Sequence, residues 1–350
     1  MKGAAHCAAP FFFAMRRTGN ASKRAAPSKT EGAGKKSPSM RPSTQSIQSD
    51  TGDTLERLGG SGPDRLGLAV SGGPDSLALL LLASGQGPVH AATVDHGLRP
   101  ESRNEAEHVA AICAARGVPH HILAVCLPTG STQAQARAAR YRVLGEWCVA
   151  NGLTHLATAH HADDQAETLL MRLARGAGLS GLAGIRRERP LRPGVTLIRP
   201  LLDRRKAELE DVVAAAGLRP VRDPSNASLR YDRTHARALL AQAGWLDPVR
   251  IANSAAHLAQ AEAALEWAAD RAAAERIEDC SCDPRDLPPE ILRRLMLRLF
   301  ARFGVEPRGP ELVRLIAALR DGRPGTLGGV QVTPGTRWTL TVAPPRRGDR

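Results

Sequence analysis

Apolar and polar residues follow two alternating patterns between residues 65 and 243. Short apolar runs, typical of buried strands, alternate with segments in which apolar residues recur every three or four positions, as on one face of a helix. Because each predicted strand is followed by a helix, the pattern indicates an α/β fold with a doubly wound parallel sheet. The predicted strands are residues 66–70, 89–94, 120–126, 154–159 and 196–201, and the predicted helices are residues 75–84, 101–116, 132–150, 163–174 and 204–216.

The pattern changes after residue 247, where alanine-rich helical periodicity replaces the alternation. It predicts helices at 249–278, 288–303 and 309–320, followed by a small hairpin between residues 322 and 344. We therefore expect a smaller, mainly helical domain after the α/β domain. The predicted parts are a disordered basic tail (1–62), the α/β domain (63–245) and the helical region with its short terminal hairpin (246–350).

Basic residues are concentrated at the start of the chain. Residues 1–49 carry nine lysines and arginines against one glutamate, so they account for +8 of the net charge of +13. Their composition favours disorder and is also typical of an organelle transit peptide, which stays open as an alternative. The remaining charge of +5 permits a nucleic-acid partner without requiring one. No apolar run is long enough to cross a membrane.

A serine- and glycine-rich turn follows the first predicted strand directly. It reads Ser71-Gly72-Gly73-Pro74-Asp75-Ser76, and Asp75 and Ser76 are expected to cap the apolar helix behind it. The glycines leave room for a ligand to approach the free amides at the helix start, which is how phosphates are held. The turn is neither a Walker A loop nor G-x-G-x-x-G. The alternative is an ordinary strand-to-helix turn.

Histidines and carboxylates follow two other predicted strands. Asp95 precedes His96 and Gly97 after the second strand, and the stretch from His160 to Glu167 follows the fourth. Asp164 lies four residues beyond His160, and Glu167 lies three beyond Asp164, so these side chains can share a helix face. An acid/base or metal role explains the whole group. The alternative is that acidic residues suit a helix N-terminus, which does not account for the histidine pair.

Arginines recur at three further places along the chain. Arg137, Arg140 and Tyr141 share one face of a predicted helix, and Arg199 ends the last predicted strand. Guanidinium groups so placed can hold phosphate or carboxylate oxygens. A solvated basic face is the plain alternative. The third place is the helix start that carries Tyr231, Arg233, His235 and Arg237, which suits RNA phosphates or is a simple surface feature.

Together these motifs resemble the tRNA(Ile)-lysidine synthetase family of the pyrophosphate-loop ATPase superfamily. The similarity runs from about Leu66 to Arg237, and a weaker helical match continues to about residue 320. One departure is Gln133, where the family usually carries Glu. The motifs are Ser71-Gly72-Gly73-Pro74-Asp75-Ser76, Val94-Asp95-His96-Gly97-Leu98-Arg99, Arg137-x-x-Arg140-Tyr141 and Ala157-Thr158-Ala159-His160-His161-Ala162-Asp163-Asp164-Gln165-Ala166-Glu167-Thr168.

The resemblance implies an adenine nucleotide α-hydrolase-like fold and a two-step reaction with ATP and Mg²⁺. ATP would adenylate O2 of the wobble cytosine in tRNA(Ile) with a CAU anticodon, releasing pyrophosphate, and the ε-amine of L-lysine would then displace AMP at C2. Residues 63–245 would be the catalytic domain and 246–350 a tRNA-binding accessory region. The family resemblance also implies a bacterial cytoplasmic protein and leaves a homodimer open.

We assign roles to individual residues on this basis. The catalytic candidates are His160, Asp164 and Arg140; the ATP-binding candidates are Ser71, Gly72, Gly73, Pro74, Asp75, Ser76 and Asp95, with Asp75 also close to Mg²⁺; the tRNA- or lysine-binding candidates are Arg137, Glu167, Arg199, Arg233 and Arg237.

Three other interpretations stay open at this point. They are another tRNA-modifying enzyme of the superfamily such as a thiolase, a small-molecule adenylating synthetase, and a non-catalytic tRNA-binding protein. Thiolases that use sulfur or iron–sulfur chemistry need paired cysteines, and the six cysteines here form no C-x-x-C pair. The intact histidine–carboxylate stretch argues against a non-catalytic protein.

Overall fold

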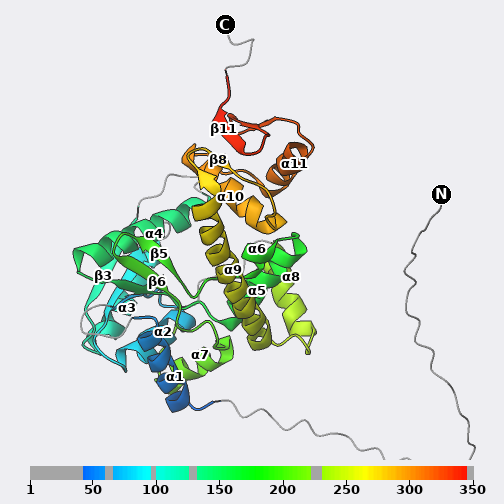
Figure 1. Ribbon diagram of the computed structural model, residues 1–350. Helices are drawn as coiled ribbons and strands as arrows, with labels where there is room; N and C mark the ends of the chain where they lie inside the picture. Colours follow the sequence, from blue (N-terminus) through cyan, green and yellow to red (C-terminus); the bar gives the residue numbers. More distant parts are fainter. Residues whose placement is uncertain (1–41, 60–65, 96–99, 126–131, 222–230, 345–350) are drawn as a thin grey trace, which may run out of the picture. The chain divides into compact units, whose positions relative to one another are not determined.

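The computed structural model describes residues 42–59, 66–95, 100–125, 132–221 and 231–344. Within these ranges a six-stranded sheet is ordered β3-β2-β1-β4-β6-β5. Figure 1 labels β3, β5 and β6 of this sheet. All neighbouring pairs are parallel except β5–β6, and helices cover both faces, so the predicted doubly wound α/β class is confirmed. The strands are β1 (Leu66–Ala69), β2 (His90–Asp95), β3 (His120–Ala124), β4 (His155–Ala157), β5 (Glu188–Arg192) and β6 (Val195–Ile198).

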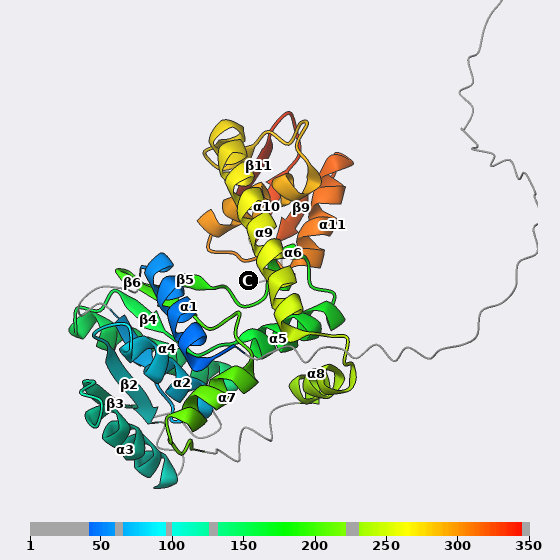
Figure 2. The ribbon, with the colours of Figure 1, turned by 90° about the horizontal axis from the view of Figure 1, so that it is seen from below.

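The two faces of the sheet bury two different sets of helices. Leu68 of β1 points toward the face that is packed by α1, α2, α3 and α7. Of these helices, α1, α2 and α7 lie next to one another in Figure 2. Leu156 of β4 points to the other face, where Leu144 and Trp147 of α4 cover it. Gly67 keeps that second face open, since a Cβ there would lie 2.7 Å from the Trp147 ring. The helices of this part are α1 (Thr44–Arg57), α2 (Pro74–Ser84), α3 (Pro100–Ala114), α4 (Gln133–Ala150), α5 (Ala162–Ala174), α6 (Leu179–Leu182), α7 (Lys206–Ala215) and α8 (Tyr231–Gln242).

Helix α1 corrects part of the sequence prediction. Residues 44–57 were expected to be disordered, yet they form a helix whose N-cap, Ser43, accepts a hydrogen bond from the amide of Ser46. Only two large apolar side chains of α1, Ile47 and Leu55, are buried, and so few apolar residues give a weak helix signal in the sequence. Burial of these two residues in the main core stabilises α1. The remainder of the predicted tail lies outside the described residues, apart from residues 42, 43, 58 and 59.

Strand β5 is a second difference from the prediction. The expected sheet was all parallel, whereas β5 runs antiparallel to β6. A tight turn at residues 193–194, with Gly194 at φ +79°, joins β5 to β6 as an antiparallel hairpin. Pro190 and the charged residues of β5 gave no strand signal, because such residues are usually depleted in strands. They suit an edge strand, which this is.

The last part of the described chain contains three helices and a second sheet. The expected helices are present, and the expected hairpin is part of an antiparallel sheet ordered β7-β8-β11-β10-β9. Leu295, Phe300 and Trp338 lie in the hydrophobic core that this sheet shares with the helices. None of the described helices combines the length and apolarity needed to cross a membrane. The elements are α9 (Pro248–Arg276), β7 (Ile277–Glu278), β8 (Ser281–Cys282), α10 (Pro289–Arg302), α11 (Gly309–Arg320), β9 (Gly325–Leu327), β10 (Val330–Thr333) and β11 (Trp338–Val342).

Candidate active site

The turn between β1 and α2 is held in shape by one hydroxyl group. Ser76 Oγ accepts a hydrogen bond from the amide of Ser71 (3.1 Å) and donates one to the carbonyl of Gly73 (3.0 Å). Gly72 adopts φ +84°, a left-handed conformation that favours glycine. A Cβ at Gly72 would also lie 3.0 Å from Val221 Cγ2. The turn is therefore a fixed loop and not a loose connection.

The N-terminus of α2 is left open by its sequence. Gly73, and not Asp75 or Ser76, is the N-cap, so the predicted capping by those two side chains is wrong. Since glycine has no side chain and Pro74 occupies the first turn, no side chain caps the helix. The amides of Asp75 and Ser76 are thus oriented to bind an anion at the positive end of the helix dipole. This geometry is that of a phosphate cradle.

Asp75 places a carboxylate beside this cradle. Its Oδ1 atom is buried and has no hydrogen-bond partner in the described structure, which is costly unless a ligand completes it. Nowhere in the described chain do three or more histidine, cysteine, aspartate or glutamate side chains cluster to hold a metal by themselves. Mg²⁺ commonly binds to one carboxylate together with phosphate oxygens and water. The orphaned oxygen of Asp75 fits that arrangement.

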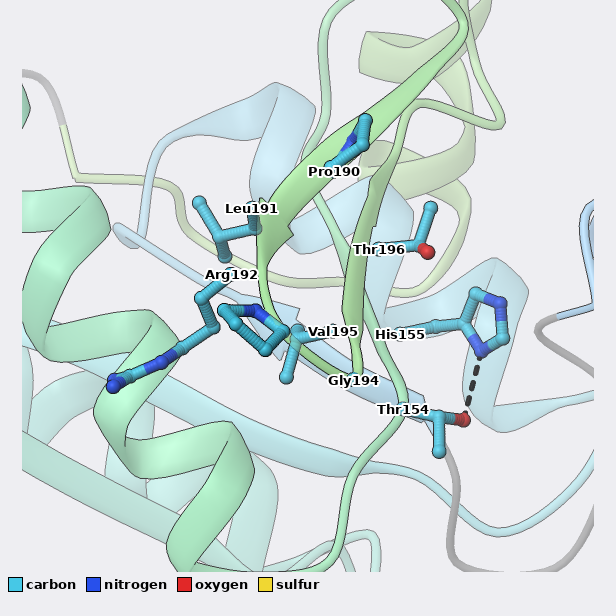
Figure 3. A pocket seen from close by; sticks show the side chains of 9 residues that line it. Thr154, His155, Pro190, Leu191, Arg192, Gly194, Val195 and Thr196 are labelled. Atoms are coloured by element: carbon cyan, nitrogen blue, oxygen red, sulfur yellow. Dashed lines mark hydrogen bonds between the residues drawn. The ribbon is translucent and has the colours of Figure 1, made fainter.

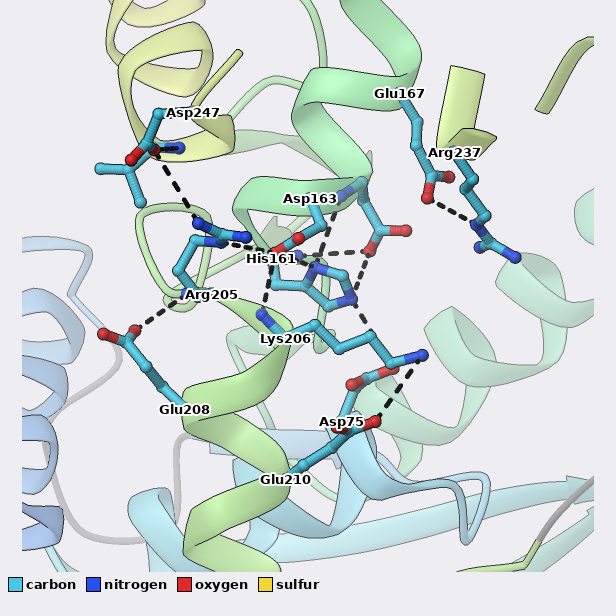
Figure 4. A network of polar contacts seen from close by, with 12 residues as sticks. Asp75, His161, Asp163, Glu167, Arg205, Lys206, Glu208, Glu210, Arg237 and Asp247 are labelled. Carbon is cyan, nitrogen blue, oxygen red and sulfur yellow. Dashed lines mark hydrogen bonds and ion pairs between the residues drawn. The ribbon is translucent and has the colours of Figure 1, made fainter. Parts of the chain in front are cut away.

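His161 lies at the centre of a group of carboxylates (Figure 4). Its Nε2 atom is 3.4 Å from Asp164 Oδ2 and 3.7 Å from Asp75 Oδ2, and its Nδ1 is 3.7 Å from Asp163 Oδ2. Burial alone would lower the pKa of this imidazole, but the carboxylates of Asp75, Asp164 and Asp163 around it raise it. His161 also caps α5, with Asp164 as the reciprocal partner. Sequence reasoning missed this central position because the two adjacent histidines are equivalent in the motif.

His160 has a different environment from its neighbour. Its Nδ1 atom shares a hydrogen bond with the Thr158 hydroxyl (3.0 Å). Burial, together with the positive charges of nearby Arg199 and Arg137, lowers the pKa of His160 to about 3. The expected side-by-side arrangement with Asp164 is replaced by contacts of Asp164 with His161 and Arg233. His160 is thus a neutral imidazole near physiological pH.

The segment before α7 closes the carboxylate group from a third side. The amide of Lys206 donates a hydrogen bond to Asp163 Oδ2 (2.8 Å), and Arg205 Nε lies 3.4 Å from the same oxygen (Figure 4). Asp163 is therefore tied to the start of α7. No motif in residues 204–206 indicated this contact, which depends on the tertiary fold.

Glu167 anchors two arginines from α8, as far as the described residues extend. The carboxylate is buried and lies 2.8 Å from Arg233 Nε and 2.6 Å from Arg237 Nε. Arg233 also approaches Asp164 Oδ1 at 3.3 Å. The hydrogen bond to Glu167 raises the pKa of Arg237. The structure thus brings together four of the predicted site residues, although they come from two separate stretches of sequence.

A second group of arginines surrounds Tyr141 on α4. The guanidinium of Arg137 lies 5.1 Å and that of Arg189 5.2 Å from the ring centroid, within the range of cation–π contacts. Buried Arg199 interacts with Tyr141 and donates a hydrogen bond to the carbonyl of Arg186. Arg189 was missed because β5 was not predicted. Its sequence carries no signal of its own.

The two remaining predicted residues occupy the expected elements. Arg140 is exposed on α4, one turn from Arg137. Asp95 ends β2, on the same edge as the loop after β1, and its Oδ1 accepts a hydrogen bond from Ser102 (2.7 Å). The motif residues that directly follow Asp95 lie outside the described ranges.

A cavity of about 610 Å³ lies where β4 and β6 begin, at the end of the sheet opposite the carboxyl ends of the parallel strands (Figure 3). It is lined by Thr154, His155 and residues 190–196. β4 and β6 begin there, whereas ligands of doubly wound sheets bind at the carboxyl ends of the strands. The cavity is therefore separate from the cradle and its carboxylates.

The fold and the open helix N-terminus define the class of protein. Residues 44–243 match the PP-loop domain, an ATP-using family. A solved structure with the same fold is the U34-tRNA thiolase NcsA from Methanococcus maripaludis, with a TM-score of 0.50 and 17% identity. The alignment covers 61% of this chain and 77% of the thiolase.

Two curated relatives narrow the class to one family. A tRNA(Ile)-lysidine synthase from Novosphingobium aromaticivorans is 49% identical over 298 residues, which are 82% of this chain and 91% of that protein. One from Zymomonas mobilis is 46% identical and covers 81% and 90% respectively. The chain belongs to the tRNA(Ile)-lysidine synthase family, which confirms the resemblance drawn from the motifs.

Proposed function

We propose that this protein is a ligase that forms a carbon–nitrogen bond between L-lysine and C2 of the wobble cytidine in tRNA(Ile) with a CAU anticodon. The observation that carries the proposal is the open phosphate cradle of α2 beside the carboxylates around His161. Family membership supports the substrate, since the relatives are named for tRNA(Ile) and lysidine.

The cradle supports the first half of the reaction. Ser71, Gly72, Gly73, Pro74, Asp75 and Ser76 would hold the phosphates of ATP, with Asp95 at the adjacent strand end. O2 of the cytosine attacks the α-phosphorus, pyrophosphate leaves, and the base is left as an O2-adenylate. Preorganised amides stabilise the charge that develops on the leaving group.

Asp75 is the residue that would hold Mg²⁺. The ion supplies charge neutralisation for the departing pyrophosphate. The support is the orphaned Oδ1 atom of Asp75, which faces no other partner in the described chain.

The second half of the reaction requires a neutral amine. A free lysine amine has a pKa of about 10.4 and must lose its proton before it attacks C2. Asp164 is our candidate for receiving that proton, and His160, which stays neutral, is our candidate for orienting the amine. Asp164 is already fixed by His161, while neutral His160 can accept a hydrogen bond. AMP leaves as the carbon–nitrogen bond forms.

The arginines are proposed to bind the anionic parts of the substrates. Arg140 would stabilise charge on the transferred phosphate, and Arg137 and Arg199, which both interact with Tyr141, would bind tRNA or lysine. Glu167 with Arg233 and Arg237 would form a second contact for tRNA or lysine. Residues 246–350 would contribute further contacts with the tRNA, and residues 63–245 would carry out the chemistry. We also propose a cytoplasmic location and leave a homodimer to be tested by light scattering.

The deciding experiment supplies ATP, labelled lysine and a CAU-anticodon tRNA(Ile), and then analyses the digested RNA for lysidine. We expect label in that nucleoside and one pyrophosphate per product, and neither with a GAU-anticodon tRNA. Asp164→Asn should abolish incorporation while tRNA binding is retained, and Glu107→Gln, at an exposed position, should behave as the wild type. Pyrophosphate release without tRNA would identify a small-molecule synthetase instead. Sulfur incorporation would identify a thiolase, and tRNA binding without ATP consumption a non-catalytic protein.

A further inference from the structure

Glu262 is a buried carboxylate in the middle of helix α9. Only 5% of its surface is exposed, and glutamate is almost never buried this deeply unless it is paired. The helix contacts α5 and α6 on one side and α10 on another. Glu262 therefore lies where the α/β part of the chain meets the helices that follow it.

The contacts of Glu262 with α10 are made through one arginine. Arg294 NH1 is 3.2 Å from Glu262 Oε1, and NH2 is 2.7 Å from Oε2, so the pair is a bidentate fork. Arg294 is itself buried and also pairs with Glu290 (2.9 Å) and with Glu266. Arg294 thus keeps two carboxylate partners if the charge of Glu262 is removed.

The other contacts of Glu262 reach the segment between α5 and β5. Arg186 Nη2 lies 3.9 Å from Glu262 Oε1, and the Ser180 side chain interacts with the same carboxylate. Burial opposes ionisation of Glu262, but Arg294, Ser180 and Arg186 together hold its pKa below the usual value. The carboxylate is therefore a charged link between α10 and residues 180–186.

This segment also supports an arginine of the candidate active site. The backbone carbonyl of Arg186 accepts a hydrogen bond from the guanidinium of buried Arg199. Arg199 interacts in turn with Tyr141. A shift of Arg186 would consequently move the acceptor that orients Arg199. Small displacements of positioning groups can cost large factors in rate.

We propose that Glu262 is a positioning residue that couples α10 to the active site through Arg186 and Arg199. Its carboxylate fixes the segment 180–186 against α9, and this segment fixes the Arg199 guanidinium. The effect on tRNA modification rests on the proposed function, whereas the effect on the segment does not.

The chain offers a matched pair of variants. Glu262→Gln keeps the shape of the side chain and removes the charge that faces both Arg294 and Arg186. Glu266→Gln removes a charge from the same Arg294 without a contact to Arg186 or Ser180. We expect Glu262→Gln to lower kcat for lysidine formation about tenfold or more, with KM for ATP changed less than twofold. Glu266→Gln should keep the wild-type kcat. Equal kcat values in the two variants would overturn the proposal.

Two further measurements decide the inference even if Glu262→Gln does not fold or the wild type forms no lysidine. Arg186→Gln leaves the Arg294 fork intact, so it should fold and reproduce the loss in kcat even if Glu262→Gln is insoluble; a wild-type kcat would overturn the proposal. Amide hydrogen exchange of residues 180–186 should be faster in Glu262→Gln than in Glu266→Gln. If the wild type forms no lysidine, the proposed function fails, and the exchange result alone then decides the inference.

Discussion

Arg237 Nε lies 2.6 Å from Glu167 Oε1, although the two residues are seventy positions apart on α8 and α5. The carboxylate is buried, while the Arg237 side chain is 47% exposed. Arg233 shares the same acceptor residue at 2.8 Å. One buried charge on α5 therefore anchors the basic face of α8.

Glu167→Gln should accordingly weaken the attachment of α8. Loss of the buried charge leaves two guanidiniums with weaker, neutral hydrogen bonds, and we expect the free energy of unfolding to fall by about 2 kcal/mol. Urea denaturation at pH 7 measures this change. Glu107→Gln removes one member of an exposed pair with Arg103 and should cost less than about 0.5 kcal/mol. Similar losses in both variants would show that Glu167 is not an anchor.

Gly72→Ala should disturb the phosphate loop directly. The left-handed φ of +84° costs a non-glycine residue about 1–2 kcal/mol. The new Cβ would also lie 3.0 Å from Val221 and 3.1 Å from Val109. We expect a lower unfolding midpoint and a raised KM for ATP. Gly87→Ala meets no atom within 4 Å and should leave both quantities unchanged; an unaffected Gly72→Ala enzyme would contradict a fixed loop.

His160 should remain neutral well below the usual titration range of histidine. Its pKa is about 3 in the folded chain and 6.5 in the unfolded chain, so below pH 6.5 the unfolded state binds the extra proton. The stability that depends on neutral His160 is complete above pH 6.5 and is lost as the pH falls toward 3. NMR of labelled histidines, assigned with His160→Gln, should show no titration of this residue between pH 8 and 5. A midpoint near 6.5 would refute the prediction.

Two core thiols should resist alkylation in the folded protein. Burial raises the pKa of Cys113 to about 11 and that of Cys148 to about 12. Because the thiolate is the reactive form, iodoacetamide at pH 8 should label these residues only after unfolding, whereas half-buried Cys280 should react in the native state. Because these thiols ionise at a higher pH in the folded protein than in the unfolded chain, the free energy of unfolding should fall as the pH rises from about 9 toward about 12. Rapid native labelling of Cys113 or Cys148, read by peptide mass spectrometry, would contradict this account.

The strands and the phosphate loop could be predicted because their signals are local. An apolar run such as Leu66–Ala69 ends where Ser71 and the glycines begin, and this order alone places the loop at a carboxyl edge. The helix α1 could not be predicted in the same way, because it is stabilised by tertiary contacts. Ile47 and Leu55 are buried only because they pack into the core formed by other parts of the chain.

The sequence predicted which residues belong to the candidate site, but not which of them contact one another. His160 and His161 are neighbours in one motif, yet only His161 faces the carboxylates, because the extended backbone at the N-cap (ψ 179°) directs the two side chains differently. Arg189 lies beside Tyr141 only because the β5–β6 hairpin returns it there. Such contacts depend on the path of the chain between distant residues.

The helix α9 has a mechanical consequence that follows from its length. Its 29 residues form one continuous helix of about 43 Å. If a helix of that length tilts by about 5° around one end, its other end moves by about 4 Å. A small rotation where α9 meets α5 thus becomes, at the far end beside β7, a movement somewhat smaller than the spacing of about 4.8 Å between neighbouring strands.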